Sequence, residues 1–149
     1  MNSRKVYRCI GMMSGTSADG VDAALLETDG RGHARPLRFH SIAYTPGERA
    51  TIKSAFGLRN RSDVHVLAAE DIITSRHIQA VEELLGGETA DLIGFHGQTI
   101  FHDPSQKMTI QIGNAQALAD FFHTQVVHDF RSADMAAGGQ GAPLLPLYH

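Results

Sequence analysis

The stretch VYRCIGMMSGTSADGVDAALLET, residues 6–28, consists of two apolar runs on either side of a turn rich in glycine, serine and aspartate. The runs at 6–13 and 21–28 have the composition of β-strands, and the turn formers between them end the first strand. A third run over 36–44 alternates imperfectly between apolar and polar residues, after the Asp-Gly-Arg-Gly break at 29–32. Because connections this short cannot hold a crossover helix, the three runs predict an antiparallel meander.

The pattern changes to a helical period after the third strand. Pro46 suits the first position of a helix, and this helix is predicted to continue over 51–56. Ser62 is the predicted N-cap of a longer helix, in which apolar residues recur at helical spacing as far as Leu85. The pair Gly86-Gly87 ends it, because glycine readily adopts the left-handed conformation found at helix C-termini.

The rest of the sequence predicts further strands and helices. They are a buried strand over 91–95, a hairpin of 100–103 and 108–112, a helix over 115–123 with Asn114 as its N-cap and Ala117, Leu118, Phe121 and Phe122 on its buried face, and a strand over 124–128. Residues 129–143 are predicted to form a glycine-rich loop. This order predicts an α/β fold with a mixed sheet, in which parallel strands are added to the meander through crossover helices.

Composition and charge exclude several classes of protein. The chain has 149 residues, a formal net charge of -3 and 42% hydrophobic residues, as is typical of one globular domain. A general binder of nucleic acid would need a basic face, so the mildly acidic balance argues against one. The single cysteine, Cys9, excludes an internal disulfide framework and a cysteine-rich zinc site, and it fits a reducing compartment. No window reaches the ~18 apolar residues of a spanning helix and no signal peptide is visible, so a soluble cytoplasmic protein is expected.

The turn between the first two strands, within residues 11–22, is the first segment that could carry chemistry. Gly15 and Gly20 permit close approach and positive φ, so consecutive backbone N–H groups can face an anion. Three hydroxyl groups add donors, those of Ser14, Thr16 and Ser17. Asp19 and Asp22 could hold a magnesium ion that bridges to a phosphate. The alternative is a plain hairpin turn, in which these residue types are also common.

A second segment, residues 94–103, follows a buried strand at the position where open α/β sheets bind ligands. His96 and Gln98 bring hydrogen-bonding groups that suit sugar hydroxyls. Two alternatives remain open. His96 and His102 could bind a metal, although their spacing matches no familiar ligand pattern, or the histidine could be satisfied by backbone groups alone.

The third segment is residues 129–143. Asp129 can accept a hydrogen bond from a sugar hydroxyl, and Arg131 can clamp a carboxylate. Glycines at 138–141 would let the backbone approach a ligand closely, and the alternative is an Asp129–Arg131 ion pair beside a flexible connector. Residues 111–114 are a weaker candidate, a strand-to-helix turn whose helix N-terminus could face an anion.

Together, the segments at 11–22, 94–102, 111–114 and 129–146 resemble the anhydro-N-acetylmuramic acid kinase family, and they occur in the family's order. The resemblance implies the two-lobed fold of actin-like ATPases and sugar kinases, whose N-terminal lobe holds a ribonuclease H-like mixed sheet. It also implies the conversion of 1,6-anhydro-N-acetylmuramic acid to N-acetylmuramic acid 6-phosphate with ATP, in the recycling of bacterial cell-wall peptidoglycan. In that reaction water opens the anhydro ring while the sugar oxygen takes the γ-phosphoryl group.

The resemblance also assigns residues to the ligands. The family's ATP-binding signature falls on Gly15, Thr16, Ser17, Ala18, Asp19, Gly20, Val21 and Asp22. Ala18 stands where the family usually has leucine, a packing change that is expected to leave the turn intact. The sugar cleft would be lined by His96, Gln98, Asp129 and Arg131. Asp19 and Asp22 would hold Mg, which accompanies ATP as cofactor.

Length separates this chain from the family, whose members run to more than twice its size. We therefore expect residues 1–149 to be the N-terminal lobe alone, with the second lobe and the nucleoside contacts beyond His149. The resemblance places the general base in an Asp-Thr-Gly-Pro-Gly-Asn motif that does not occur in this sequence, and Asp134 is a weaker local candidate. Since general base catalysis contributes ~10²–10⁴ in rate, the chain by itself is expected to have little or no kinase activity.

Two other functions remain open. The chain could be a non-catalytic module that keeps a sugar or phosphate pocket, docks onto a second lobe on a separate chain, or pairs as a homodimer through its exposed inter-lobe surface. A histidine-based metalloenzyme is the least favoured alternative. The expected ligands are ATP and an anhydro amino sugar, with no nucleic-acid or membrane partner.

Overall fold

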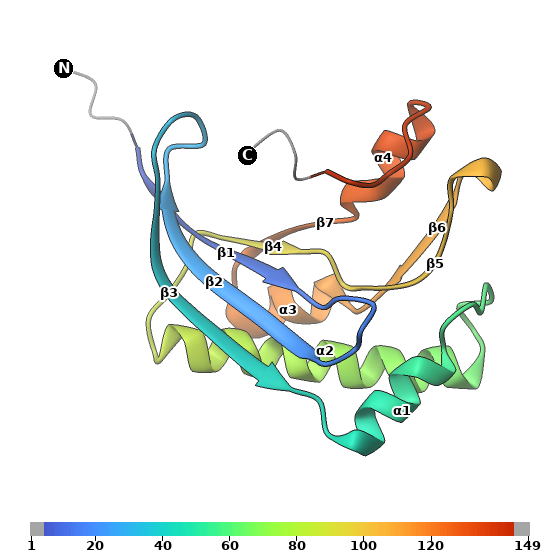
Figure 1. The fold of residues 1–149 in the computed structure, drawn as a ribbon. Coiled ribbons are helices and arrows are strands. Elements are labelled where there is room, and N and C mark those ends of the chain that lie inside the picture. Colours follow the sequence, from blue (N-terminus) through green and yellow to red (C-terminus); the bar gives the residue numbers. More distant parts are fainter. Residues whose placement is uncertain (1–4, 145–149) are drawn as a thin grey trace.

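A computed structural model describes residues 5–144 of the chain (Figure 1). Residues 1–4 and 145–149, which include the end of the predicted 129–146 segment, lie outside the described part. The elements in chain order are β1 (Tyr7–Met13), β2 (Gly20–Thr28), β3 (Ala34–Ala43), α1 (Pro46–Ser54), α2 (Val64–Leu85), β4 (Leu92–Phe95), β5 (Gln98–Asp103), η1 (Pro104–Gln106), β6 (Met108–Ile112), α3 (Ala115–Phe122), β7 (Gln125–His128) and α4 (Phe130–Ala136). None of the helices described combines the length and apolarity needed to cross a membrane.

The strands form a five-stranded sheet and a separate hairpin of β5 and β6. The larger sheet has the order β3-β2-β1-β4-β7, antiparallel between β1, β2 and β3 and parallel between β1, β4 and β7. The predicted meander with parallel additions is thereby confirmed. Since β1, β4 and β7 run in the same direction, their carboxyl ends meet at one edge of the sheet (Figure 1). Open α/β sheets bind ligands at this edge.

The hydrophobic core lies between the larger sheet and α2, which runs along one face of the strands in Figure 1. Inward and outward side chains alternate along the strands, so Ile10 and Leu25 are almost fully buried while their neighbours are not. From the helix side, Ile73 and Val81 fill the same core. Burial of each such side chain stabilises the fold by about 1.5–3 kcal/mol and fixes where the strands end.

The long helix α2 is capped at both ends. Its N-cap is Asp63, whose Oδ1 accepts a 2.8 Å hydrogen bond from the His65 amide, and the prediction of Ser62 is wrong by one residue. An aspartate at this position satisfies a backbone donor and also places negative charge at the positive end of the helix dipole. At the other end Gly86 has φ 57° and ends the helix as predicted.

The substitution Asp63→Ala is expected to lower the free energy of unfolding by about 1 kcal/mol, because it leaves the first turn of α2 without its side-chain acceptor. The matched control Ser62→Ala removes a neighbouring hydroxyl that does not cap the helix, so its effect should stay within about 0.5 kcal/mol. Urea unfolding of both variants measures the difference, and equal losses would contradict the assignment of the cap.

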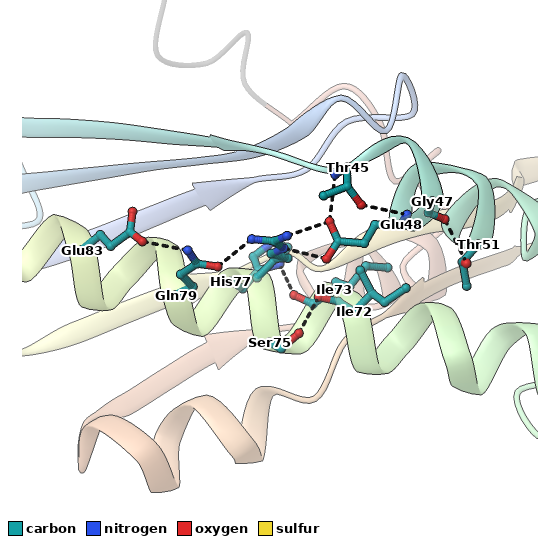
Figure 2. A network of polar contacts seen from close by, with 11 residues as sticks. Thr45, Gly47, Glu48, Thr51, Ile72, Ile73, Ser75, His77, Gln79 and Glu83 are labelled. Atoms are coloured by element: carbon teal, nitrogen blue, oxygen red, sulfur yellow. Dashed lines mark hydrogen bonds and ion pairs between the residues drawn. The ribbon is translucent and has the colours of Figure 1, made fainter.

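Helix α1 is anchored at its start by a polar network (Figure 2). The Thr45 amide donates to Glu48 Oε2 at 2.8 Å, and the Glu48 amide donates to Thr45 Oγ1 at 3.2 Å, which is a capping box. Glu48 also accepts hydrogen bonds from Nε and Nη2 of Arg76 in α2, each at 2.8 Å. The Arg76 guanidinium holds the pKa of the Glu48 carboxyl below its usual value. The network therefore ties α1 to α2 and fixes the direction in which α1 leaves the sheet.

Two predicted details of the helices are wrong. Helix α1 ends at Ser54, because the amides of residues 55–56 bond to carbonyls three residues earlier and form a tighter turn. Phe121 in α3 is 53% exposed, although it was expected on the buried face. Leu118 and Phe122, one helical turn apart, face inward instead, and Phe121 packs edge-on against Phe122.

Residues 130–136 form α4, within the segment predicted to be a loop. Their sequence, FRSADMA, contains neither glycine nor proline, and Met135 is buried to 2% exposure. The burial of Met135 and the absence of glycine and proline allow these residues to form a short helix. The glycine-rich connection is thus confined to the residues after α4.

The turn between β2 and β3 is closed by its own aspartate. Asp29 Oδ1 accepts hydrogen bonds from the amides of Arg31 (3.0 Å), Gly32 (3.1 Å) and His33 (3.0 Å). Because β2 runs antiparallel to β1, this turn lies at the edge of the sheet opposite the carboxyl ends of β1, β4 and β7.

Candidate functional site

Three chain segments gather at the carboxyl edge of the parallel strands. Residues 14–19 follow β1, residues 96–97 follow β4, and residues 129–131 follow β7. A cavity of about 590 Å³ adjoins the last two segments. Its lining includes Glu70, His96, Gln111, Asn114, Asp129 and Ser132. The volume is that of a small-molecule site. Apart from Glu70, which belongs to α2, these residues come from segments that the sequence predicted separately.

The turn after β1 has a well-defined backbone. The Ala18 amide donates a 3.0 Å hydrogen bond to the Gly15 carbonyl, and Ala18 has φ 53° with its methyl group fully buried. Thr16 and Ser17, between them, are exposed. The tip of the turn is therefore accessible to a ligand while its base is packed.

The far end of the turn is held by groups from β3 and α1. The Asp19 carbonyl accepts a 3.0 Å hydrogen bond from the Tyr44 amide, and the Asp19 carboxylate lies 3.0 Å from Arg49 Nη2. Arg49 also donates to the Ser17 carbonyl at 3.1 Å. At Gly20 a Cβ atom would collide with the Ile42 carbonyl oxygen, so only glycine fits. The sequence analysis did not identify Arg49, because nothing local links it to a turn thirty residues earlier.

The carboxylates predicted to hold magnesium are both exposed. Asp19 pairs with Arg49, and Asp22 Oδ1 accepts a 2.5 Å hydrogen bond from Ser41 Oγ. Across residues 5–144, no three His, Cys, Asp or Glu side chains are grouped to hold a metal ion. Magnesium is commonly bound by one or two carboxylates together with phosphate oxygens and water, so these two side chains fit it only alongside a phosphate ligand. Their magnesium role stays a prediction.

His96 has both ring nitrogens engaged within the protein. Arg131 Nε donates to His96 Nε2 at 2.7 Å, and His96 Nδ1 lies 3.0 Å from the Gly97 carbonyl oxygen. Arginine can only donate, so Nε2 is the acceptor, Nδ1 carries the proton and the ring is neutral. Burial, with the Arg131 charge as a smaller cause, lowers the pKa of His96 from its ordinary value of 6.5. The ring thus lines the cavity with no nitrogen free for a ligand in this conformation.

The substitution Arg131→Met is expected to raise the pKa of His96, because it removes a nearby positive charge and frees Nε2 to take a proton. Imidazole ¹⁵N chemical shifts followed through a pH titration report both the tautomer and the pKa. The matched control Arg59→Met removes a guanidinium that stacks on Phe101. An unchanged His96 titration in the Arg131 variant would contradict the assigned tautomer.

The other predicted sugar-binding side chains are placed differently. Gln98 is fully buried and bonds to Ser14, outside the cavity lining. Asp129 lines the cavity, with φ 59° and its Oδ1 accepting a 2.5 Å hydrogen bond from Ser132 Oγ. Arg131 is not among the residues that line the cavity, and it donates hydrogen bonds to His96 and to the Gly141 carbonyl. The predicted contacts of these residues with a sugar remain untested.

Asp134, the weaker candidate for a base, has a structural contact. Its Oδ2 accepts a 2.7 Å hydrogen bond from the Gly141 amide, and its carbonyl accepts one of 2.9 Å from the Gly139 amide. A Cβ atom at Gly139 would collide with the Asp134 carboxylate. Asp134 therefore folds the glycine-rich connection back onto α4.

Two residues that line the cavity are not indicated by any motif or pattern in the sequence. Arg61, in the loop before α2, donates to the Gln111 carbonyl at 2.5 Å, and Glu70 Oε1 accepts a 2.9 Å hydrogen bond from the Gly113 amide. Their partners lie more than forty residues away along the chain. Asn114 confirms its predicted role, since its Oδ1 accepts from the Ala117 amide at 3.0 Å and caps α3 at the cavity wall.

Comparison with known proteins identifies close sequence relatives. A family model described as anhydro-N-acetylmuramic acid kinase matches residues 7–149. Proteins named anhydro-N-acetylmuramic acid kinase are similar to 94% of the chain, at 49% identity in Rhizorhabdus wittichii and 46% in Zymomonas mobilis. A third, from Acidiphilium cryptum, is 49% identical over 144 residues. The chain spans 41%, 42% and 39% of the length of these three relatives, respectively.

Proposed function

Because the chain belongs to the anhydro-N-acetylmuramic acid kinase family, we propose that it supplies the phosphate-binding turn and part of the sugar cleft for phosphorylation of 1,6-anhydro-N-acetylmuramic acid by ATP. In this reaction water adds to the anomeric carbon as the anhydro bridge opens, and the released sugar oxygen takes the γ-phosphoryl group. The products are N-acetylmuramic acid 6-phosphate and ADP. We expect this proposed reaction, a step of cell-wall recycling, to take place in the cytoplasm, where ATP is available.

One observation carries this proposal: the glycine-rich turn and the cavity segments meet at the carboxyl edge of three parallel strands. Phosphoryl transfer needs a phosphate donor and a sugar acceptor at fixed positions relative to one another. A rigid sheet whose strand ends carry both half-sites satisfies this requirement.

The turn is the proposed phosphate half of the site. The backbone amides and hydroxyls at Gly15–Ser17 would bind the β- and γ-phosphates, each hydrogen bond to a charged oxygen contributing about 1.5–3 kcal/mol. Asp19 and Asp22 would hold magnesium, which neutralises phosphate charge when bound. Arg49 would hold the Ser17 peptide in place, because it donates a hydrogen bond to that carbonyl oxygen.

The cavity is the proposed sugar half. The Asp129 carboxylate can accept a hydrogen bond from a sugar hydroxyl. The neutral His96 ring would form an uncharged part of the cavity wall. Arg131 would orient His96, and Gln98 would support the segment from beneath. Turnover would also require a general base, which the resemblance assigns to a motif that does not occur in these 149 residues.

The test is NMR titration of the 149-residue chain with a magnesium complex of a non-hydrolysable ATP analogue, and separately with the anhydro sugar. The nucleotide should shift the amide signals of Gly15–Ser17, and the sugar should shift those of 96–97 and 129–132. Amides of 30–32, at the opposite edge, are the internal control. A product assay should show little turnover by the chain alone. If neither the nucleotide analogue nor the sugar shifts any amide signal, the proposal is overturned. Normal turnover would overturn the expectation that the reaction needs residues beyond those of this chain.

A further inference from the structure

Three buried polar side chains are linked by hydrogen bonds inside the fold. Ser14, Gln98 and Tyr44 are only 2%, 0% and 7% exposed. Ser14 Oγ lies 2.6 Å from Gln98 Oε1 and 3.1 Å from Tyr44 Oη. Gln98 Oε1 can only accept, so the single serine proton goes to it, and the Tyr44 hydroxyl donates to Ser14. The two hydroxyl protons therefore have one defined direction, from Tyr44 to Ser14 to Gln98, and Gln98 Nε2 donates to the Thr99 carbonyl at 3.2 Å.

Two members come from the two proposed half-sites, and Tyr44 lies in the connection between β3 and α1. Ser14 is the first residue of the phosphate turn, and Gln98 begins β5 directly after His96 and Gly97. Ser14, directly after β1, and Gln98, the first residue of β5, are also joined by an isolated parallel β-bridge. The Tyr44 amide bonds to the Asp19 carbonyl at 3.0 Å. Tyr44 thus holds the turn at both ends, through its hydroxyl at Ser14 and its amide at Asp19.

Stability alone does not account for this group. A hydrogen bond contributes only about 0.5–1.5 kcal/mol net, and apolar replacement of both buried partners is often nearly neutral. What polar side chains add is geometry, because each hydrogen bond is satisfied only over a narrow range of separations and angles. Fixed geometry matters here because the group spans the junction between phosphate turn and histidine segment.

We propose that Ser14, Tyr44 and Gln98 are positioning residues that set the separation of the phosphate turn from the sugar-side segment at 96–97. This inference rests on the proposed function. None of the three side chains needs to touch a ligand. The group acts through the amides of Gly15–Ser17, which it holds in one place before nucleotide arrives.

The test is Tyr44→Phe and Gln98→Leu, with ¹⁵N relaxation of the ligand-free chain and binding of the magnesium–nucleotide analogue as readouts. Matched controls are Tyr7→Phe, at the far end of β1, and Gln106→Leu, in the exposed η1.

Order parameters at Gly15–Ser17 should fall from about 0.85 towards 0.6 in both test variants, with α2 unchanged. Nucleotide affinity should fall about tenfold or more, because the loss of one hydrogen bond to a charged phosphate oxygen corresponds to at least about that factor. Ser14→Thr keeps the hydroxyl and should remain close to wild type, whereas Ser14→Ala should not.

The outcomes separate this inference from the proposed function. Selective loss of order in the turn supports the positioning role, whereas unchanged order parameters, or an equal loss throughout the chain, would overturn it. Failure of the wild-type chain to bind nucleotide would overturn the proposed function and, with it, the ligand-related part of this role. The relaxation measurement would then still decide whether the group fixes the turn.

Discussion

The Gly97→Ala variant is expected to lose about 3 kcal/mol or more of its free energy of unfolding. Gly97 has φ 73°, and a Cβ atom there would lie 2.5 Å from the Ile112 carbonyl oxygen. The left-handed conformation costs an alanine about 1 kcal/mol. The larger part comes from displacing backbone, because the obstructing oxygen belongs to β6 and no side chain can move aside.

The matched control for this variant is Gly57→Ala. Gly57 also has a positive φ, 81°, but no atom lies within 4 Å of the position its Cβ would take. Its loss should therefore be limited to about 1 kcal/mol, the cost of conformation alone. Urea denaturation of the two variants isolates the steric contribution. Losses of equal size would contradict the close approach of Gly97 to Ile112.

Acidification from pH 7 to pH 4 is expected to cost about 3 kcal/mol of stability through His77 alone. The His77 ring is fully buried, edge-on to Phe95 at 5.0 Å, with Nδ1 2.7 Å from the Ile73 carbonyl oxygen. Among residues 5–144, no group hydrogen-bonds its Nε2. Burial lowers the pKa of His77 from 6.5 to about 4, against a smaller opposing effect of the Ile73 carbonyl.

The sign follows from proton uptake. With the folded pKa of His77 below the unfolded value, the unfolded chain binds more protons between pH 6.5 and 4. The stabilisation is complete above pH 6.5 and is lost as the pH falls towards 4. Lowered pKa values of carboxyls such as that of Glu48 act below about pH 4.5, a range that overlaps that of His77 only near pH 4.

The measurement is urea unfolding at intervals from pH 7 to pH 4. The variant His77→Phe keeps a ring in the core and should remove the His77 share of the slope, leaving that of His96, whose pKa is also lowered by burial. His65→Gln, at an exposed position on the same helix, is the matched control and should keep it. A wild-type slope that survives in His77→Phe would contradict the role of the buried ring.

Most of the fold could be predicted because its signals are local. The apolar runs and short connections of residues 6–44 define the meander, and glycine at 86 ends α2 as expected. The errors arise where tertiary contacts decide. Burial of Met135 stabilises a helix in the segment predicted to be a loop. In α3, Leu118 packs into the core, and Phe121 is therefore exposed to solvent.

The candidate site could be predicted only in part. The sequence identifies the turn, His96 and Asp129, because glycine and polar residues cluster after strands. It cannot show that Gln98 turns inward, since its partner Ser14 lies 84 residues away in the sequence. For the same reason it does not indicate Arg49, whose contacts with the turn exist only once α1 has packed.

The aspartate-closed turn between β2 and β3 gives this protein a convenient attachment point. It holds its shape through Asp29 and lies at the edge of the sheet remote from the cavity. Cys9 is half-buried, and burial raises its thiol pKa, so it forms little reactive thiolate. A fluorophore coupled through Arg31→Cys would therefore label one chosen place and leave the carboxyl edge of the parallel strands free for optical titration of the proposed ligands.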